Sequence, residues 1–145
     1  MNLKGVLFVL GQFSGIAAIA FTGPLWAKHP FLMALEIAGI LLGFWAIYTM
    51  RKSQLRIVPE VGKNASLVTD GPYHWVVHPM YTAVLITTLA MVLDAPTWWR
   101  VLIWIALFLI LNFKFRYEES QLEQKFGDDF RTFLHHRKKL IPFIY

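Results

Sequence analysis

Four apolar stretches, each close to twenty residues long, constrain this chain more than any other feature of its sequence. They cover roughly residues 5–22, 31–50, 75–93 and 97–113. A helix of about 20 apolar residues crosses a bilayer core about 30 Å thick. The composition agrees, because 57% of the residues are hydrophobic and only 16% are charged, against about 45–50% and about 25% in ordinary soluble domains. The sequence therefore predicts an all-α integral membrane protein, with four transmembrane helices in a single membrane domain over residues 1–145.

The basic residues are divided unequally between the two predicted sides of the membrane. Of the 14 lysines and arginines, 12 lie near the N-terminus, in the 51–78 connection or in the tail from residue 114, whereas Lys28 and Arg100 lie at the other two connections. Cytoplasmic segments carry the excess of basic residues. We therefore expect both termini in the cytoplasm, in a bacterial inner membrane or the endoplasmic reticulum. The net charge of +5 then reflects topology and contact with anionic membrane lipids, and no nucleic-acid partner is expected.

Glycine pairs in the first two stretches indicate which helices pack closely against each other. Gly11 and Gly15 are four residues apart, as are Gly39 and Gly43. Such pairs let helix backbones approach closely in lipid. Their matching depths predict that the first two helices pack antiparallel through these glycines, and coincidental spacing is the alternative.

Polar residues collect in the connection before the third stretch and in the tail after the fourth. Asp-Gly-Pro at residues 70–72 is a turn signal. Pro79 disfavours helical geometry at His78 and suits a first helical turn, so the regular part of the third helix is expected to begin at Pro79. The fourth helix is expected to continue into a cytosolic C-terminal helical tail that stops at Gly127, followed by a short helix over residues 128–135.

These polar segments carry an ordered set of short motifs. They are Leu67-Val68-Thr69-x-Gly71-Pro72-Tyr73, His78-Pro79-x-Tyr81, Glu118-Glu119 followed by Leu122, Phe126-Gly127, and a basic residue before Leu140-Ile141-Pro142. The set resembles integral-membrane methyltransferases of the isoprenylcysteine carboxyl methyltransferase and phospholipid methyltransferase group. The resemblance covers roughly residues 55–142. It implies an enzyme that binds S-adenosylmethionine at the cytosolic edge of the membrane and methylates a lipophilic small molecule or a lipid.

The resemblance also implies where the cofactor contacts lie, namely in residues 67–81 and 114–142. S-adenosylmethionine carries two cations and a carboxylate, which call for partners of opposite charge. Glu118 and Glu119 are expected to meet the cations, with Lys114, Arg116 and the His78 ring as partners for the carboxylate. Glu118 and Arg116 are the predicted catalytic residues, and no metal site is expected. The predicted cofactor contacts are Leu67, Val68, Gly71, Pro72, Tyr73, His78, Pro79, Tyr81, Glu118 and Glu119.

The methyl acceptor stays open at this point. Relatives commonly carry arginine where this chain has His74 and Val77, so the contacts of those arginines do not carry over. A prenylcysteine carboxylate, a phospholipid amine and a small apolar metabolite all fit. A carboxylate acceptor needs no general base, whereas an amine or a phenol must lose a proton, which His78 or Glu118 could take. The predicted site requires the turn at residues 71–73 to fold against Glu118 and Glu119.

Two further functions are compatible with the sequence. The first is an NADPH-dependent enzyme similar to membrane sterol reductases. Those enzymes share a His-Pro-x-Tyr segment and end in a sequence similar to Ile141–Tyr145. A small proton-coupled transporter is the other, because Glu36 is the carboxylate inside a predicted span and intramembrane acids are functional candidates. The simpler reading of Glu36 is that its carboxylate reaches the interface or pairs with Lys28 or His29.

Overall fold

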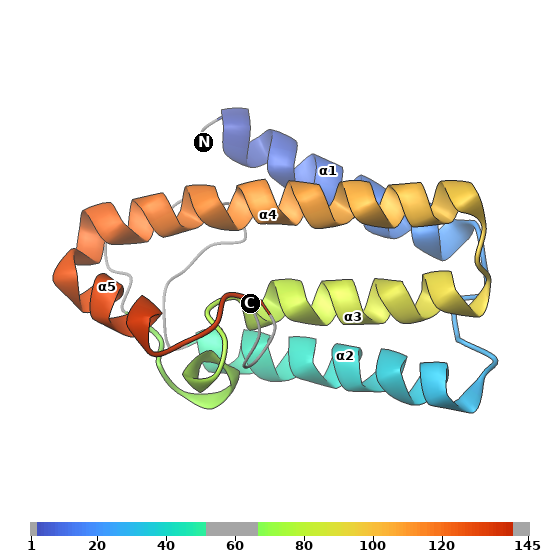
Figure 1. Ribbon diagram of the computed structural model, residues 1–145, viewed down its shortest axis with the longest axis horizontal. Coiled ribbons are helices and arrows are strands. Elements are labelled where there is room, and N and C mark those ends of the chain that lie inside the picture. Colours follow the sequence, from blue (N-terminus) through green and yellow to red (C-terminus); the bar gives the residue numbers. More distant parts are fainter. Residues whose placement is uncertain (1–2, 52–66, 141–145) are drawn as a thin grey trace.

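In the part of the chain that the structure describes, four long helices run alongside one another, and two short helices lie at one end of them (Figure 1). The computed structural model describes residues 3–51 and 67–140. Motif residues 141–142 and basic residues 52, 56 and 63 lie outside this part. The elements, in chain order, are α1 (Leu3–Phe21), α2 (Pro30–Met50), the 3₁₀ helix η1 (Gly71–His74), α3 (Pro79–Asp94), α4 (Trp98–Phe126) and α5 (Asp128–His135).

Three of the described helices, α1, α2 and α4, are long and apolar enough to cross a membrane. In lipid, a helix satisfies every backbone polar group within its own segment. The chain is thus an integral membrane protein, and its all-helical prediction is confirmed. α3 is apolar but has only 16 residues, about 24 Å at 1.5 Å per residue. The structure therefore supports three of the four predicted spans by length and adds one shorter apolar helix.

Local backbone chemistry sets the helix ends. Pro79 occupies the first turn of α3, and His78 before it is non-helical, with φ −123° and ψ 61°. This confirms the predicted start at Pro79 and corrects the helical stretch from residue 75. α4 ends before Gly127, which has a φ of +53° that favours glycine. α5 then covers residues 128–135, as predicted.

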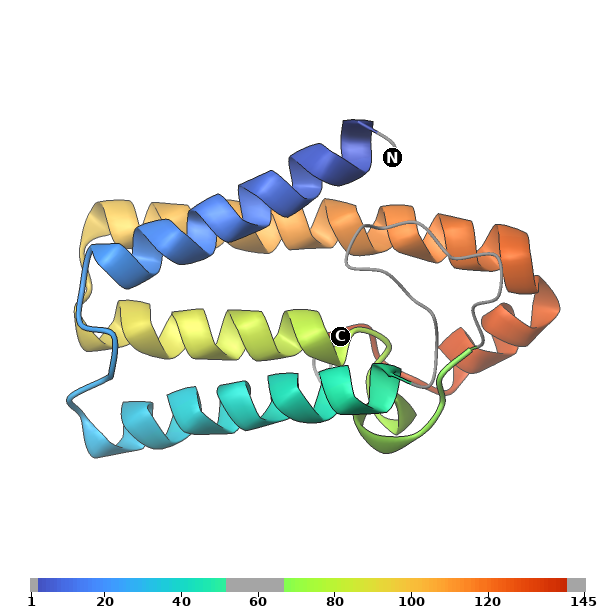
Figure 2. The same ribbon diagram turned by 180° about the vertical axis from the view of Figure 1, so that it is seen from behind.

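The helices pair differently from the prediction based on the glycines. α2 packs mainly on α3, and α1 packs mainly on α4 (Figure 2). Gly11 and Gly15 lie against side chains of α4, and Gly39 and Gly43 lie against α3. The expected contact between α1 and α2 through these glycines is therefore wrong. Each pair does allow a close helix approach, but the partner helix is another one.

Buried apolar side chains from α1, α3 and α4 form the main core. Ile19 of α1 and Leu107 and Leu111 of α4 are almost fully enclosed, and Phe115 extends this core toward the end that carries α5. Because lipid is as apolar as these side chains, close packing contributes more to helix association here than burial from water does.

Polar groups join the helices at the end opposite α5. The buried Arg100 donates from Nη1 to Ala95 O at 2.6 Å and from Nη2 to Ile19 O at 3.1 Å. These bonds satisfy carbonyls at the ends of α3 and α1 that lack an intrahelical partner. Asp94 Oδ1 accepts hydrogen bonds from the backbone N–H groups of Lys28 and His29.

Glu36 belongs to this end of the molecule as well. Its Oε2 accepts a hydrogen bond from the backbone N–H of Ala27 at 2.9 Å, and the residue is 2% exposed. The expected pairing with Lys28 or His29 is therefore wrong, because the backbone of the turn before α2 supplies the partner. This carboxylate holds the turn against α2, which is a structural role.

Candidate functional site

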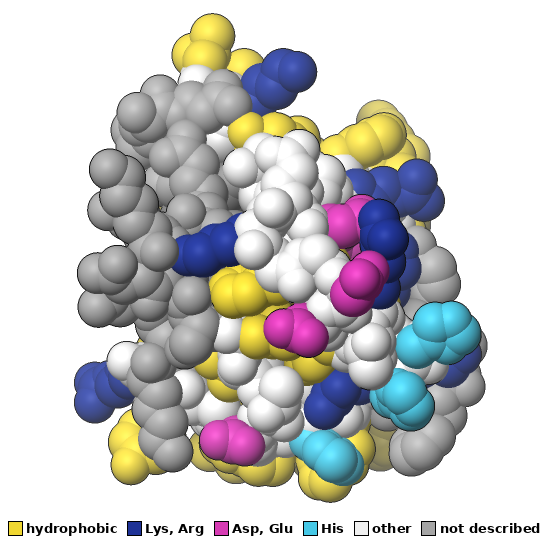
Figure 3. All heavy atoms as spheres, turned by 90° about the vertical axis from the view of Figure 1, so that its left-hand side faces the viewer, with side chains coloured by type: hydrophobic (Ala, Val, Ile, Leu, Met, Phe, Trp, Pro, Cys, Tyr) yellow, Lys and Arg dark blue, Asp and Glu magenta, His cyan; other side chains and the backbone are white. Residues whose placement is uncertain are grey.

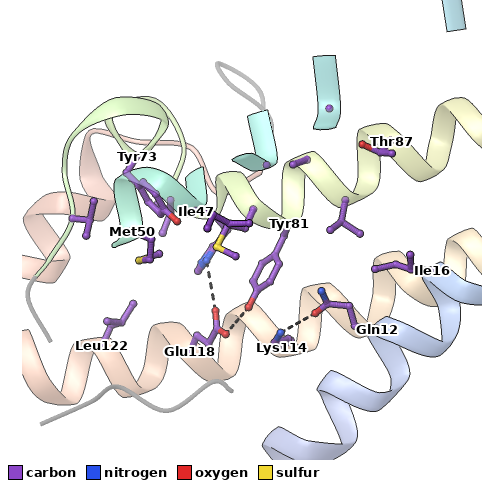
Figure 4. Close-up of a pocket in the computed structure, with 18 of the residues that line it drawn as sticks. Gln12, Ile16, Ile47, Met50, Tyr73, Tyr81, Thr87, Lys114, Glu118 and Leu122 are labelled. Carbon is purple, nitrogen blue, oxygen red and sulfur yellow. Dashed lines mark hydrogen bonds and ion pairs between the residues drawn. The ribbon is translucent and has the colours of Figure 1, made fainter. Parts of the chain in front are cut away.

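A cavity of about 440 Å³ lies between the four long helices and reaches the end that carries α5 (Figure 4). Ligand pockets in proteins commonly measure about 300–1,000 Å³. Most of its walls are apolar, and a few polar side chains converge inside. Its lining includes Gln12, Phe13 and Ile16 of α1, Gly39, Ile40, Gly43, Ile47 and Met50 of α2, Leu67, Val68, Tyr73, Val77 and His78 of the connection, Met80, Tyr81, Ala83, Val84, Thr87 and Thr88 of α3, Lys114, Glu118 and Leu122 of α4, and Phe130 and Phe133 of α5.

His78 links the two adjacent glutamates of α4. Its Nε2 lies 3.2 Å from Glu119 Oε1, and its Nδ1 lies 3.9 Å from Glu118 Oε2. The imidazole is stacked between the rings of Tyr81 and Phe115, with centroids 5.5 Å and 5.1 Å away. The hydroxyl of Tyr81 donates a hydrogen bond to Glu118 Oε1. The predicted His-Pro-x-Tyr and Glu-Glu motifs therefore meet in one cluster.

Glu118 and Glu119 differ in what they face. Glu118 lines the cavity beside Tyr81. Glu119 is not among the lining residues, and its carboxylate accepts from Lys139 Nζ at 3.1 Å as well as contacting His78. Glu118 is thus available to a bound molecule, whereas Glu119 orients the imidazole of His78.

Tyr73 brings the Gly-Pro-Tyr turn to the same cavity. Gly71 has a φ of +56°, and a Cβ there would lie 2.8 Å from Thr49 Oγ1 of α2, so glycine lets η1 pack on α2. The Tyr73 hydroxyl is buried and has no hydrogen-bond partner among the described residues. Burial, together with the charge of Glu118, raises the pKa of the Tyr73 phenol. The hydroxyl therefore stays protonated at neutral pH and can donate to a ligand.

Residues 137–140, which we call the tail strap, hold the connection before α3 in place. The backbone N–H of Val77 donates to Lys138 O at 2.8 Å, and that of His78 donates to Lys139 O at 3.1 Å. These bonds accompany a parallel β-bridge between Val76 and Lys138. The irregular backbone at His78 is therefore hydrogen-bonded by the tail.

Side chains strengthen the tail strap at both ends. Arg137 Nε donates to Tyr73 O at 2.9 Å, and the guanidinium lies 4.2 Å from the centroid of the Phe133 ring. At the other end, Thr82 Oγ1 donates to Leu140 O at 2.6 Å. The strap thus fixes the turn that carries Tyr73 relative to the first turns of α3.

The basic, acidic and histidine side chains gather on the end of the molecule that carries α5, with apolar side chains visible between them (Figure 3). This end carries the tail strap and the Glu118–His78–Glu119 cluster, whereas Lys28, in the connection before α2, and Arg100, in the first turn of α4, lie at the other end. The charged end is therefore also the end where the polar part of the cavity lies.

The structure brings together most, but not all, of the predicted site. The predicted contacts Leu67, Val68, Tyr73, His78, Tyr81 and Glu118 line the cavity. Gly71, Pro72 and Pro79 shape the backbone around it without being lining residues. Arg116 is exposed, and its Nε donates to Asn112 Oδ1 at 3.0 Å, so the structure does not bring this predicted catalytic residue to the cavity.

The two positions where relatives carry arginine have different surroundings. Val77 is buried against Phe130 and Phe133 and lines the cavity. His74 is exposed, with its ring near that of Trp75. An apolar wall of the cavity therefore stands where one of those arginines would be.

Several cavity residues escape sequence analysis. Gln12 of α1 lies outside the motifs, yet it accepts a hydrogen bond from Lys114 Nζ at 2.8 Å inside the cavity. A single amide in an apolar stretch was the signal available for it. Phe130 and Phe133 close the cavity from α5, and the apolar face of that short helix was their signal.

The residues present fit S-adenosylmethionine. Glu118 offers an anionic partner for a sulfonium or an ammonium. The buried hydroxyl of Tyr73, which has no hydrogen-bond partner in residues 3–51 and 67–140, can donate to a ligand. Leu67, Val68 and Met50 provide an apolar wall beside them. The cavity can thus hold a molecule that combines cationic and flat apolar parts.

Comparison with known proteins identifies the family to which this chain belongs. A comparison with curated protein sequences gives no significant match. The sequence model of the phospholipid methyltransferase family matches residues 28–129, which is more than half of the chain and includes the motifs around Tyr73, His78 and Glu118. The chain therefore belongs to the phospholipid methyltransferase family, whose members are S-adenosylmethionine-dependent methyltransferases.

Proposed function

We propose that this protein transfers a methyl group from S-adenosylmethionine to a lipophilic acceptor at the cytosolic face of the membrane, as isoprenylcysteine carboxyl methyltransferases do. The observation that carries the proposal is the single cavity shared by Tyr73, His78 and Glu118. Family membership supports methyl transfer to a lipid. The excess of basic residues at the end that carries α5 supports a cytosolic location for that end.

The order of side chains along the cavity supports separate places for cofactor and acceptor. In Figure 4, Tyr73, Met50 and Leu122 lie on one side of Glu118, and Ile16 and Thr87 lie beyond Tyr81 on the other side. The first group lies near the charged end, from which a water-soluble cofactor would come. The second lies between the apolar helices. Glu118 and Tyr81 would then stand where the two molecules meet.

The apolar half of the cavity supports access from the lipid. Phe13 of α1 and Ile47 of α2 line the cavity and are 54% and 48% exposed. α1 and α2 both contribute walls, yet they are not one of the helix pairs that pack extensively against each other. An acceptor with an apolar chain could therefore enter between these two helices, with α3 as the floor.

The protein's part in the reaction is to orient the reactants, exclude water and handle a proton. S-adenosylmethionine, when bound, supplies an electrophilic methyl group to a nucleophile aligned with it. The apolar walls keep water from the reacting atoms. An acceptor amine or hydroxyl would give its proton to Glu118 or His78, with Glu119 fixing the imidazole through Nε2. A carboxylate acceptor needs no such transfer.

The experiment that tests this proposal uses isotopically methyl-labelled S-adenosylmethionine. Membrane extracts are incubated with the labelled cofactor and the protein, and mass spectrometry identifies the labelled product. We expect a labelled lipophilic product. The rate of its formation should fall at least about 100-fold with Glu118→Ala and by a smaller factor with Glu119→Gln. Glu36→Gln is the matched control, because its carboxylate bonds the far turn, and it should leave the rate within about twofold.

A second measurement separates methyl transfer from NADPH chemistry. Purified protein is titrated with S-adenosylhomocysteine and, separately, with NADPH. Binding of the first alone supports the proposal. Tight binding of NADPH, or the absence of labelled product from every extract together with no binding of S-adenosylhomocysteine, would overturn it.

A further inference from the structure

Lys114 and Gln12 form a buried polar pair inside the cavity, separate from the Glu118–His78–Glu119 cluster. Lys114 Nζ donates to Gln12 Oε1 at 2.8 Å, and the two residues are 2% and 8% exposed. The ammonium also lies 5.0 Å from the centroid of the Tyr81 ring. Both residues line the cavity. The pair therefore faces any molecule that occupies this space.

Lys114 makes no direct ion pair among the described residues, and the nearby charge of Glu118 acts on it from a greater distance. A buried ammonium is costly unless an opposite charge compensates it, and Lys114 carries three N–H donors. Within residues 3–51 and 67–140, the ion pairs of Glu118 and Glu119 are made with His78 and Lys139, and Lys114 takes part in none. Gln12 is neutral, and Tyr81 offers its ring. Lys114 thus has donors and charge available for a ligand.

The pair lies on the acceptor side of the cavity. Figure 4 places Lys114 and Gln12 between Glu118 and Ile16, on the side of Glu118 away from Tyr73. One turn of α4, about 6 Å along its axis, separates Lys114 from Glu118, and the two side chains carry opposite charges. Beyond the pair, Ile16 and Val84 continue the apolar lining. A positive group therefore stands between the cluster and the apolar groove.

We propose that Lys114 and Gln12 bind an oxyanion of the methyl acceptor, next to the apolar chain that lies along α1 and α3. The inference deepens the proposed function, on which it rests. Its content is the assignment of this buried pair, on α4 and α1, to the anionic part of an amphiphilic acceptor. The oxyanion belongs either to a phosphate ester in a lipid headgroup or to a carboxylate. Tyr73 and the residues around it serve the cofactor, so loss of Lys114 weakens binding of the acceptor and leaves cofactor binding intact.

The test uses non-reacting probes, so that it does not depend on knowing the acceptor. The purified full chain in a nonionic detergent is titrated with dodecyl phosphate, dodecanoate and dodecanol by isothermal calorimetry. S-adenosylhomocysteine is titrated in parallel. The variants are Lys114→Met, Lys114→Arg and Gln12→Leu. Arg131→Met is the control, because Arg131 is an exposed cation whose partners Glu123 and Asp128 lie outside the cavity lining.

The expected result is selective loss of the anionic probes. The unaltered chain should bind dodecyl phosphate or dodecanoate at least about tenfold more tightly than dodecanol, as expected for hydrogen bonds to a charged group. Lys114→Met should remove this preference, Gln12→Leu should weaken it several-fold, and Lys114→Arg should retain most of it. Affinity for S-adenosylhomocysteine should stay within about twofold in every variant. The tighter of the two anionic probes identifies phosphate or carboxylate as the acceptor's oxyanion.

Three results would overturn the inference. The unaltered chain would show no preference for the anionic probes, or Lys114→Met would keep that preference. In the third result, Lys114→Met would lower the affinity for S-adenosylhomocysteine, which would mean that Lys114 binds the cofactor. If Lys114→Met does not fold, Gln12→Leu and Lys114→Arg carry the same comparison. Failure of the unaltered chain to bind S-adenosylhomocysteine contradicts the proposed function, and the probe titrations then still decide whether Lys114 and Gln12 bind the oxyanion of an amphiphile.

Discussion

At the scale of single residues, removal of the Tyr73 hydroxyl is the most direct test of ligand binding. This hydroxyl is buried without a partner among the described residues, so Tyr73→Phe removes no hydrogen bond to residues 3–51 or 67–140. We expect the free energy of unfolding to stay the same or rise by up to about 1 kcal/mol. Affinity for S-adenosylhomocysteine should fall about 2- to 10-fold, because the donor to the ligand is lost. Thermal unfolding in detergent and calorimetric titration measure the two quantities.

Tyr81→Phe is the matched comparison for Tyr73→Phe. The Tyr81 hydroxyl already donates to Glu118, so its removal should lower stability as well as activity. A Tyr73→Phe protein that loses stability but binds S-adenosylhomocysteine unchanged would contradict the role given to Tyr73.

Helical spacing explains which residues of the site could be predicted. Lys114 and Glu118 are four residues apart and share one face of α4, whereas Arg116 lies two residues from each and projects from another face. The structure accordingly places Lys114 and Glu118 in the cavity lining and leaves Arg116 exposed. Gln12 could not be predicted, because a single amide in an apolar helix has no neighbour in the sequence that indicates its partner. Its role depends on how α1 packs against α4.

At the level of elements, substitutions at two glycines of α2 test how closely α2 packs against α3. A Cβ at Gly39 would lie 3.0 Å from the backbone nitrogen of Thr87 and 3.2 Å from Ala83 O. These are backbone atoms that cannot rotate away. Gly39→Ala should therefore force α2 and α3 apart and destabilise the protein by about 1–3 kcal/mol. Thermal unfolding in detergent measures the effect.

Gly43→Ala is the control for this substitution on the same helix. A Cβ there would meet only Ala83 Cβ at 3.4 Å, an ordinary contact. Its stability should change by less than about 0.5 kcal/mol. Equal effects of the two substitutions would mean that α2 does not approach α3 as closely at Gly39 as the structure has it.

Element boundaries were predictable, whereas element pairing was not. Pro79 and Gly127 act on the backbone next to them, so the start of α3 and the end of α4 follow from local chemistry. Pairing in lipid depends on the fit of small residues against a partner surface. Glycine spacing indicates that a helix makes a close contact but does not identify the partner, so α1 and α2 were predicted to pack together when each packs on another helix.

For the whole molecule, the proposed orientation predicts which positions are reachable from each side of the membrane. The chain contains no cysteine, so single introduced cysteines report without background. Lys28→Cys and His136→Cys place thiols at exposed positions at opposite ends. In intact cells that carry the protein in the plasma membrane, an impermeant maleimide should label Cys at position 28, and position 136 only after permeabilisation. The reverse pattern would contradict the proposed orientation.

The tail strap has a consequence for the order in which the working enzyme is assembled. Residues 137–140 emerge from the ribosome after all four long helices, yet they supply hydrogen-bond partners for the backbone at Val77 and His78. Helices can already have inserted into the bilayer while the histidine still lacks its final support. Docking of this late-synthesised segment therefore follows synthesis of the four long helices, and a nascent chain arrested before it would be embedded in the membrane without the backbone partners of Val77 and His78.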